Sequence, residues 1–512
     1  MIKSNSLLKG VLAAALIGAF STTAGAAGAR VSPRPNVVFI LTDDQNFDTI
    51  GCFGAKVLTP AMDRLAAGGV RFTRAYTVHS VCTPSRYVCL TGQYASRSGD
   101  PRFNQVCPPG TQSNVGFNVT RPPGSLTVAK VLHDAGYVTG FVGKWHTGAP
   151  QVVRVPEEGR MDDPKVAAAL GENQRRLVEY VKGAGFDFAA GVYRGNLKDH
   201  KLDALDVHNQ EWVTKGALDF LDRAKGKPFF LHVCTTLQHG PPPIKSLRAG
   251  KDAWRVTPAG LLSEPLNVQS SRESIFERVR AAGFDADTAH ATWLDDGIAA
   301  ILKKLGDMGV AENTLVLMFS DNGTRGGKGT CYEGGANTPS ILYWKGHVPA
   351  GVVCGELVQN TDFVPTILDA AGVSPPESMH LDGRSLLPMV NDANAAWRDT
   401  TLLEVGHTRG VLTSKWKYIA VRYPPAMRKA IDAGTLGRKP YHMDNPTDLQ
   451  ITAERNHPAY WDADQLYDLE KDPGEKVNLA KDSAHAAVLA DMKGRLKAKL
   501  AEFSRPFGEF NP

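Results

Sequence analysis

The sequence predicts an α/β fold with a parallel sheet, followed by a smaller C-terminal α+β subdomain. Apolar runs of strand length alternate with segments of helical periodicity, which is the pattern of strands joined by crossover helices. Beyond about residue 395 the strand candidates become shorter, which indicates a separate part of the fold. The 512 residues far exceed what one small core requires. We therefore expect a large domain over residues 27–394 and the subdomain over residues 395–512.

Apolar content and helical spacing define the predicted elements. Thr59 precedes Pro60, a combination typical of a helix start. In the large domain we expect strands at Val37–Leu41, Val138–Val142, Phe229–Thr235 and Leu315–Phe319, and helices at Thr59–Ala67 and Asp287–Leu305. In the subdomain we expect strands at Trp416–Val421 and Gln465–Tyr467 and a helix at Ala484–Phe503. The segment Arg422–Trp461, rich in proline, charge and aromatic residues, is predicted to be a long surface loop.

Residues 1–26 have the pattern of a cleaved export signal. Lys3 and Lys9 flank a short polar start, the apolar run Val11–Phe20 follows, and Ala24-Gly25-Ala26 offers small residues for cleavage. The run is too short to span a bilayer comfortably, and no later stretch is long and apolar enough, so a retained membrane anchor is the weaker alternative. We therefore expect a periplasmic or secreted protein without a membrane span.

Charge and cysteine content exclude two function classes. The formal net charge of +5 is a weak basic excess that does not indicate nucleic-acid binding. None of the seven cysteines has a CxxC or other zinc-binding spacing. With Cys82 set aside, the remaining six allow fifteen pairings in an oxidising compartment, so no disulfide is assigned. These six are Cys52, Cys89, Cys107, Cys234, Cys331 and Cys354.

Two polar groups directly follow predicted strands. Asp43-Asp44-Gln45 follows the run VVFIL, and Asp321-Asn322-Gly323 follows LVLMF. In open α/β sheets, ligands bind beyond the carboxyl ends of the strands. Adjacent carboxylates repel each other unless a cation compensates, and carboxylate and amide oxygens suit a hard ion such as Ca²⁺. The alternative is that each pair forms only a turn or a helix cap.

Cys82 begins a segment whose spacing suits anion chemistry. Pro84 fits the first turn of a helix, which places Cys82 at a helix N-terminus, where anions are stabilised. Arg86 is four residues further and shares a helix face with Cys82. A nucleophile and a cation would then converge on one anion. The alternative is a buried structural cysteine beside a surface arginine.

A second cation and a titratable base follow the strand predicted at Val138–Val142. Lys144 and His146 are two residues apart and point the same way on an extended segment. Such a pair suits the chemistry of an anion, although a surface lysine and a packed histidine are the alternative.

Taken in order, these motifs resemble the type I sulfatase family of the alkaline-phosphatase superfamily. CTPSRYVCLTG at Cys82–Gly92 is similar to the first family signature, and GYVTGFVGKWH at Gly136–His146 is similar to the second. Further matching pieces are TDDQ (Thr42–Gln45), QHGP (Gln238–Pro241), SDNG (Ser320–Gly323), GGKGTCYEGG (Gly326–Gly335), DFVPTILDAAG (Asp362–Gly372) and QLYDLEKDPGEKVNL (Gln465–Leu479). The resemblance implies a large mixed, mainly parallel sheet flanked by helices, with a smaller C-terminal α+β subdomain.

The resemblance also implies a role for each matching residue. A maturation enzyme oxidises Cys82 to formylglycine, whose hydrated form supplies a gem-diol oxygen. Arg86 orients this group, and His146 pairs with it. Asp43, Asp44, Asp321 and Asn322 hold one divalent ion, Ca²⁺ with Mg²⁺ as the alternative, which also contacts position 82. Lys144 and Lys328 bind sulfate oxygens, and His239 contacts the leaving-group oxygen.

Two positions depart from the family pattern or compete with it. The family often has P-H-x-P where this chain has Gln238-His239-Gly240-Pro241; Gly240 adds backbone freedom but leaves the imidazole in place. His232 competes with His239, but it lies inside a predicted strand, which favours a packing role.

The implied reaction is hydrolysis of a sulfate ester in a sulfated small molecule or polysaccharide. One diol oxygen attacks sulfur, His239 protonates the departing alcohol, and His146 removes the proton of the second hydroxyl so that sulfate leaves. One alternative is a phosphonate monoester or phosphodiester hydrolase of the same superfamily. The other is an inactive binding protein, although every expected residue is present.

Overall fold

The computed structural model describes residues 34–510, apart from 157–158, 250–251, 436–440 and 444–447. Arg34–Pro512 forms one compact unit. The export signal predicted over residues 1–26 lies outside the described residues. Within the described part of the chain, no helix has both the length and the apolar character that crossing a membrane requires.

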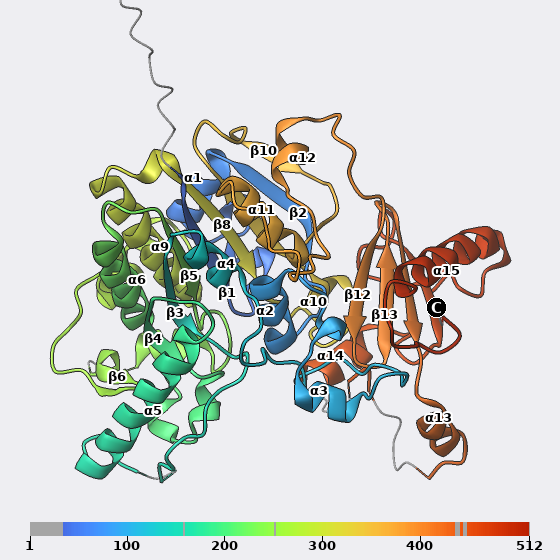
Figure 1. Ribbon diagram of the computed structural model, residues 1–512, viewed down its shortest axis with the longest axis horizontal. Coiled ribbons are helices and arrows are strands. Elements are labelled where there is room, and N and C mark those ends of the chain that lie inside the picture. Colours follow the sequence, from blue (N-terminus) through green and yellow to red (C-terminus); the bar gives the residue numbers. More distant parts are fainter. Residues whose placement is uncertain (1–33, 157–158, 250–251, 436–440, 444–447, 511–512) are drawn as a thin grey trace, which may run out of the picture. The chain divides into compact units, whose positions relative to one another are not determined.

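A nine-stranded mixed sheet carries the larger part of the fold (Figure 1). Its strands are β1 (Asn36–Thr42), β2 (Val70–Tyr76), β3 (Val138–Lys144), β4 (Phe188–Tyr193), β5 (Phe229–Cys234), β8 (Thr314–Ser320), β9 (Asn337–Tyr343), β10 (Val352–Cys354) and β11 (Val358–Gln359). Their order is β10-β2-β9-β8-β1-β5-β3-β4, and β11 also pairs with β2. Only β9 runs antiparallel to its neighbours, β2 and β8, in this sheet. The predicted mixed, mainly parallel sheet is therefore confirmed.

Helices cover both faces of this sheet, which explains why its central strands are continuous apolar runs. Along β1, Val37, Phe39 and Leu41 pack into one core and Val38 and Ile40 into the other. The helices are α1 (Pro60–Ala67), α2 (Cys82–Thr91), α3 (Pro101–Val106), α4 (Val128–Asp134), α5 (Pro164–Lys182), α6 (Gln210–Ala224), α7 (Pro243–Arg248), α8 (Arg272–Ala281), α9 (Ala289–Asp307), α10 (Glu333–Ala336), α11 (Phe363–Ala370), α12 (Leu387–Asn391), α13 (Pro425–Asp432), α14 (Asp448–Asn456) and α15 (Ala486–Leu500). The first core includes residues of α4, α5 and α11, and the second includes residues of α1, α6, α8 and α9.

The start of α1 shows how distant elements complete each other. Thr59 precedes the helix as predicted, but its side chain makes no capping hydrogen bond. Instead, the Asp295 carboxylate of α9 accepts hydrogen bonds from the backbone N–H groups of Ala61 and Met62, at 2.9 and 2.8 Å. A helix N-terminus exposes N–H groups that need such acceptors. The sequence indicated where α1 begins but not what caps it.

A second, four-stranded antiparallel sheet lies near the C-terminal end of the chain (Figure 1). Its strands, in spatial order, are β12 (Thr401–Val405), β13 (Thr408–Leu412), β14 (Trp416–Val421) and β15 (Asp464–Asp468), and α15 contributes to the core behind it. β14, β15 and α15 correspond to predicted elements, whereas β12 and β13 were not predicted. A two-stranded sheet of β6 (Val256–Thr257) and β7 (Gly260–Leu261) completes the strands. The boundary between residues 394 and 395 stays a prediction.

The prediction of a long surface loop at Arg422–Trp461 is wrong. α13 and α14 both lie in this segment. Pro425 occupies the first turn of α13, where its missing N–H costs nothing. His442 is fully buried and stacks on Tyr460, with ring centroids 3.9 Å apart. One of the prolines that suggested a loop therefore begins a helix, and aromatic residues that suggested exposure are buried in a core.

All seven cysteines are free thiols in this structure.

Candidate active site

The predicted metal ligands meet at the carboxyl ends of two neighbouring parallel strands. β1 pairs with β8 in register from Asn36–Thr314 to Thr42–Ser320, so the residues that follow the two strands are brought together. The Asp44 N–H donates to Asp321 Oδ1 at 3.1 Å, and Asn322 Nδ2 donates to Asp44 Oδ1 at 2.7 Å. Asp44 has φ 57°, a left-handed conformation that aspartate tolerates better than most residues.

The two carboxyl groups Asp43 and Asp321 titrate in opposite directions. Burial alone would raise the pKa of Asp43, but the nearby cations, Lys144 foremost, hold it well below its usual range. Burial, together with repulsion from Asp43, raises the pKa of Asp321 to about 7. A cation beside Asp321 would oppose both effects, so this group of acids is suited to a positive ion.

The donor atoms fit a hard divalent cation. Asn322 Oδ1 is buried and accepts no hydrogen bond. A buried amide oxygen without a partner costs free energy, which a metal ion would recover. Asp43, Asp44, Cys82 and His239 also offer ligand atoms that all lie within 4.8 Å of one another. Carboxylate and amide oxygens are the donors that Ca²⁺ and Mg²⁺ prefer.

Cys82 is the first residue of α2, as the sequence predicted, and its side chain points into this acidic group. Its thiol donates to Asp43 Oδ1 at 3.6 Å and lies 3.7 Å from Lys328 Nζ. All of α2 is buried, and Cys82 is only 1% exposed. Burial raises the pKa of this thiol, so the unmodified cysteine is a poor nucleophile at neutral pH.

Arg86 lies inside the site and not at the surface. Its guanidinium contacts Asp321 Oδ2 through Nε at 2.9 Å and through Nη2 at 2.8 Å, and Nη1 donates to the Lys144 carbonyl oxygen at 2.9 Å. The side chain is 2% exposed. A guanidinium in this position fixes the ends of β3 and β8 relative to the start of α2.

Lys144 and Lys328 bring two further buried cations. Lys144 Nζ donates to Asp43 Oδ2 and to Asn196 Oδ1, both at 2.6 Å. Lys328 lies between β8 and α10, and its Nζ pairs with Asp44 Oδ1. The carboxylate of Asp43 raises the pKa of Lys144 despite burial, so this lysine stays charged. Each lysine therefore contacts one of the paired aspartates and leaves its remaining N–H groups for an anion.

Three histidines were candidates, and the structure separates them. His239 Nε2 lies 3.7 Å from Asp44 Oδ2, and its side chain is 20% exposed. His146 has φ 53°; its Nε2 lies 3.7 Å from Asp199 Oδ2 and its Nδ1 is buried without a partner. His232 lies within β5 and stacks on Phe39 at 4.7 Å, away from both. Burial lowers the pKa of all three imidazoles.

Sequence reasoning missed the residues that hold this set in place. Asn196 accepts from Lys144, and Asp199 approaches His146. Both follow β4, which was not predicted because its sequence FAAGVY is poor in β-branched residues. A strand prediction there would have placed a fourth polar group at the same edge of the sheet.

A cavity of about 520 Å³ opens beside these groups. Its lining includes Thr83, next to Cys82, and His146. Because Cys82 and Lys144 are buried, His146 and His239 are the members of the set that a ligand meets first.

Comparison with known protein families gives two matches. The family model described as Sulfatase matches residues 35–373. A second model, N-sulphoglucosamine sulphohydrolase, C-terminal, matches residues 327–445.

Individual relatives agree with the family models. Arylsulfatase A of Homo sapiens is 30% identical over 494 residues, which cover 89% of this chain and 85% of the relative. N-acetylgalactosamine-6-sulfatase of Homo sapiens is 30% identical over 388 residues, which cover 70% and 67%. A solved structure of a protein with its substrate D-glucosamine-2-N,6-O-disulfate has a TM-score of 0.59 at 20% identity, covering 91% of this chain and 97% of the other. At that identity the structural likeness concerns the fold.

Proposed function

Because this chain belongs to the sulfatase family and is a sulfuric ester hydrolase, we propose that it removes sulfate from a sulfated carbohydrate, using formylglycine made from Cys82 and one divalent cation. The observation that carries the proposal is the convergence on Cys82 of two aspartates and three buried cations, Arg86, Lys144 and Lys328.

The divalent cation would be held by Asp43, Asp44, Asp321 and Asn322, with position 82 as a further ligand. The unpartnered Asn322 Oδ1 and the raised pKa of Asp321 support this assignment. Oxygen donors alone favour Ca²⁺, and Mg²⁺ fits the same chemistry. When bound, the ion supplies Lewis-acid stabilisation of negative charge on oxygen.

The side chains around Cys82 divide the work of binding and proton transfer. Lys144 and Lys328 bind sulfate oxygens, and Arg86 orients the formylglycine oxygens at the helix N-terminus. The protein can do little covalent chemistry on a sulfate monoester itself, so positioning and charge stabilisation by such groups dominate catalysis. His239, on the exposed side, donates a proton to the departing alcohol oxygen. His146 accepts a proton from position 82, and its lowered pKa keeps it neutral and able to do so.

The proposal includes two partners and a location. A maturation enzyme that oxidises cysteine to formylglycine must act on Cys82, and the segment 1–26 directs the chain to the periplasm or the medium. The relatives, among which is N-acetylgalactosamine-6-sulfatase, support a sulfated carbohydrate as the substrate. No nucleic acid is expected, since the formal net charge is only +5.

The test combines mass spectrometry with turnover. The protein is produced with and without a formylglycine-generating enzyme, and the mass of the tryptic peptide that contains position 82 is measured. Sulfate release is then measured from sulfated oligosaccharides and from an aryl sulfate. The rate of hydrolysis of an aryl phosphonate is measured for comparison. Activity that follows the modified fraction and prefers sulfate supports the proposal. An active preparation with unmodified Cys82, or preference for the phosphonate, contradicts it.

A further inference from the structure

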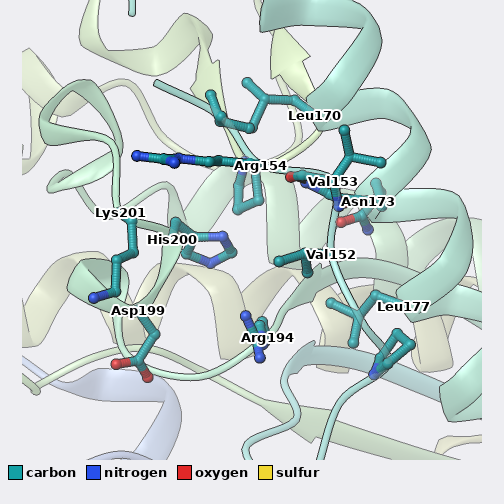
Figure 2. A pocket seen from close by; sticks show the side chains of 14 residues that line it. Val152, Val153, Arg154, Leu170, Asn173, Leu177, Arg194, Asp199, His200 and Lys201 are labelled. Carbon is teal, nitrogen blue, oxygen red and sulfur yellow. Dashed lines mark hydrogen bonds between the residues drawn. The ribbon is translucent and has the colours of Figure 1, made fainter. Parts of the chain in front are cut away.

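Two cavities beside the proposed catalytic group share part of their lining. The first is the cavity of about 520 Å³ that reaches Thr83 and His146. The second, of about 270 Å³, is shown in Figure 2. Arg194, Asp199 and Lys201 line both. A ligand whose ester lies at His146 can therefore extend past these three residues into the second cavity.

Arg194 and Lys201 carry positive charge that nothing in the described chain neutralises. Neither side chain forms an ion pair with a described residue, and the same holds for Arg154, which lines the second cavity. Asp199, the carboxylate between them in sequence, accepts the Asn196 N–H at 2.7 Å and lies 3.7 Å from His146 Nε2. Arg194 is partly buried, whereas Lys201 and Arg154 are exposed. Cations that lack a counter-ion attract an anionic ligand group, and the partly buried Arg194 is the less screened by solvent.

The opposite side of the second cavity is largely apolar. Figure 2 shows Val153, Asn173 and Leu177 facing the side formed by Asp199, His200 and Lys201. Val153 is 37% exposed although it is apolar. A wall of this kind suits the C–H face of a sugar ring, and the cations suit its charged substituents.

Backbone hydrogen bonds fix Arg194 relative to the catalytic histidine. The His146 N–H donates to the Arg194 carbonyl oxygen at 3.0 Å, and the Trp145 N–H donates to the Tyr193 carbonyl oxygen at 2.9 Å. The ends of β3 and β4 therefore move as one piece. A group held by Arg194 is positioned with respect to the ester, which is what a specificity-determining residue must achieve.

We propose that Arg194 and Lys201 bind a second anionic group, a sulfate or a carboxylate, on the carbohydrate whose sulfate ester is cleaved. This inference rests on the proposed function. A guanidinium offers two parallel N–H donors to such an oxyanion, and an ammonium adds a point charge. The preferred substrate is thus an oligosaccharide with at least two anionic groups.

The test measures binding without turnover. Isothermal titration calorimetry is performed on calcium-loaded Cys82→Ala protein with a monosulfated disaccharide and with the same disaccharide carrying a second sulfate. A third disaccharide carries a carboxylate in place of that second sulfate and shows which anion is preferred. Arg194→Gln and Lys201→Gln are added separately. The control is Lys198→Gln, an exposed lysine that lines neither cavity.

We expect the second anionic group to tighten binding about tenfold or more, and each of the two substitutions to remove most of that gain, as a charge-assisted contact of this kind would. Lys198→Gln should retain the full gain. Equal affinities for the three disaccharides would overturn the second-anion site alone. The same holds if Lys198→Gln lost as much of the gain in affinity as Arg194→Gln and Lys201→Gln do. Failure of every disaccharide to bind would count against the proposed function itself.

Discussion

Two buried charge clusters in this molecule are built from similar residues and differ in whether they are complete. The first, here called the catalytic cluster after its proposed role, has three carboxylates (Asp43, Asp44, Asp321) and three cations (Arg86, Lys144, Lys328). The second, here the closed cluster, consists of Lys417, Glu333 and Glu475 between β14 and α10. In the closed cluster Lys417 Nζ contacts Glu333 Oε1 at 2.6 Å, Glu475 Oε1 at 2.8 Å and the Cys331 carbonyl oxygen at 3.1 Å.

The difference lies in what each cluster leaves over. Lys417 Nζ faces two carboxylates and one carbonyl oxygen, all supplied by the chain itself, and its side chain is fully buried. The catalytic cluster keeps an unpartnered Asn322 Oδ1 and two partly exposed histidines. A self-contained network stabilises a fold, whereas an incomplete one is completed by a ligand. The comparison predicts that changes in the first cluster affect turnover and changes in the second affect stability.

The largest effect is expected for Cys82→Ala. Loss of the proposed nucleophile should lower turnover by at least about 10³-fold, because the groups of such a site act as a unit. The melting temperature should change little, since only the polar atoms of one side chain are removed. Turnover of an aryl sulfate and thermal unfolding are the measurements. Cys89→Ala, seven residues further on the same helix, is the matched control and should stay active.

Removal of metal should affect turnover and stability together. A chelator is expected to abolish turnover and lower the melting temperature, because the carboxylates of the catalytic cluster then lose their compensating ion. Added Ca²⁺ should restore both. Elemental analysis and calorimetry before and after chelation provide the measurement. A fully active protein that contains no metal would refute the assigned site.

His239→Ala should show a dependence on the leaving group. General acid catalysis is worth roughly 10²–10⁴-fold where the leaving oxygen needs a proton, as a sugar alkoxide does and a nitrophenolate does not. The loss should therefore be large for a sulfated sugar and small for an activated aryl sulfate. His232→Ala should lower the turnover of both substrates by the same factor, because that ring packs on Phe39. If His239→Ala lowered both rates equally, sulfate binding would describe its role better.

Lys417→Met should destabilise the fold while leaving the chemistry in place. Removing one partner of a buried ion pair leaves uncompensated charge and costs about 3–5 kcal/mol. Urea unfolding monitored by circular dichroism measures the loss, and metal content per folded chain should not change. Lys415→Met tests the same charge two residues earlier, where the side chain is 37% exposed, and should cost far less.

The smallest effect is a pH dependence of the closed cluster. Burial, together with repulsion from Glu333, raises the pKa of Glu475 to about 7. A carboxyl group whose pKa is raised on folding binds more protons in the native state, so its contribution is full below its ordinary pKa and is lost as the pH rises through about 7. Stability should therefore fall between about pH 5 and 7, by at most about 1.4 kcal/mol per pH unit. Glu475→Gln should flatten this slope in urea unfolding measured across that range.

The sequence predicted that the acidic members of the catalytic cluster would lie close together, because they directly follow strands. Asp43 and Asp321 each come directly after a buried apolar run, and parallel pairing of β1 with β8 brings such ends together. Cys82 and Arg86 share one helix face, a local relation that spacing alone determines.

The parts that could not be predicted depend on distant contacts. The reversed direction of β9 leaves no trace in its own residues, since NTPSILY would suit either orientation. Asn196 follows a strand that propensity does not reveal. His442 and Tyr460 became core residues only because the segment folds back over residues near Tyr332. Composition describes a segment by itself, and burial is decided by what packs against it.

The burial of Cys82 sets an order of events in the life of the chain. A side chain that is 1% exposed cannot enter the active site of another enzyme. Any enzyme that oxidises Cys82 must therefore reach it before α2 is enclosed. That enclosure comes late in synthesis, because Tyr87 and Val88 of α2 pack in one core with Leu402 of β12 and Met492 of α15. The nascent chain thus keeps a time window for modification that closes when its last quarter folds.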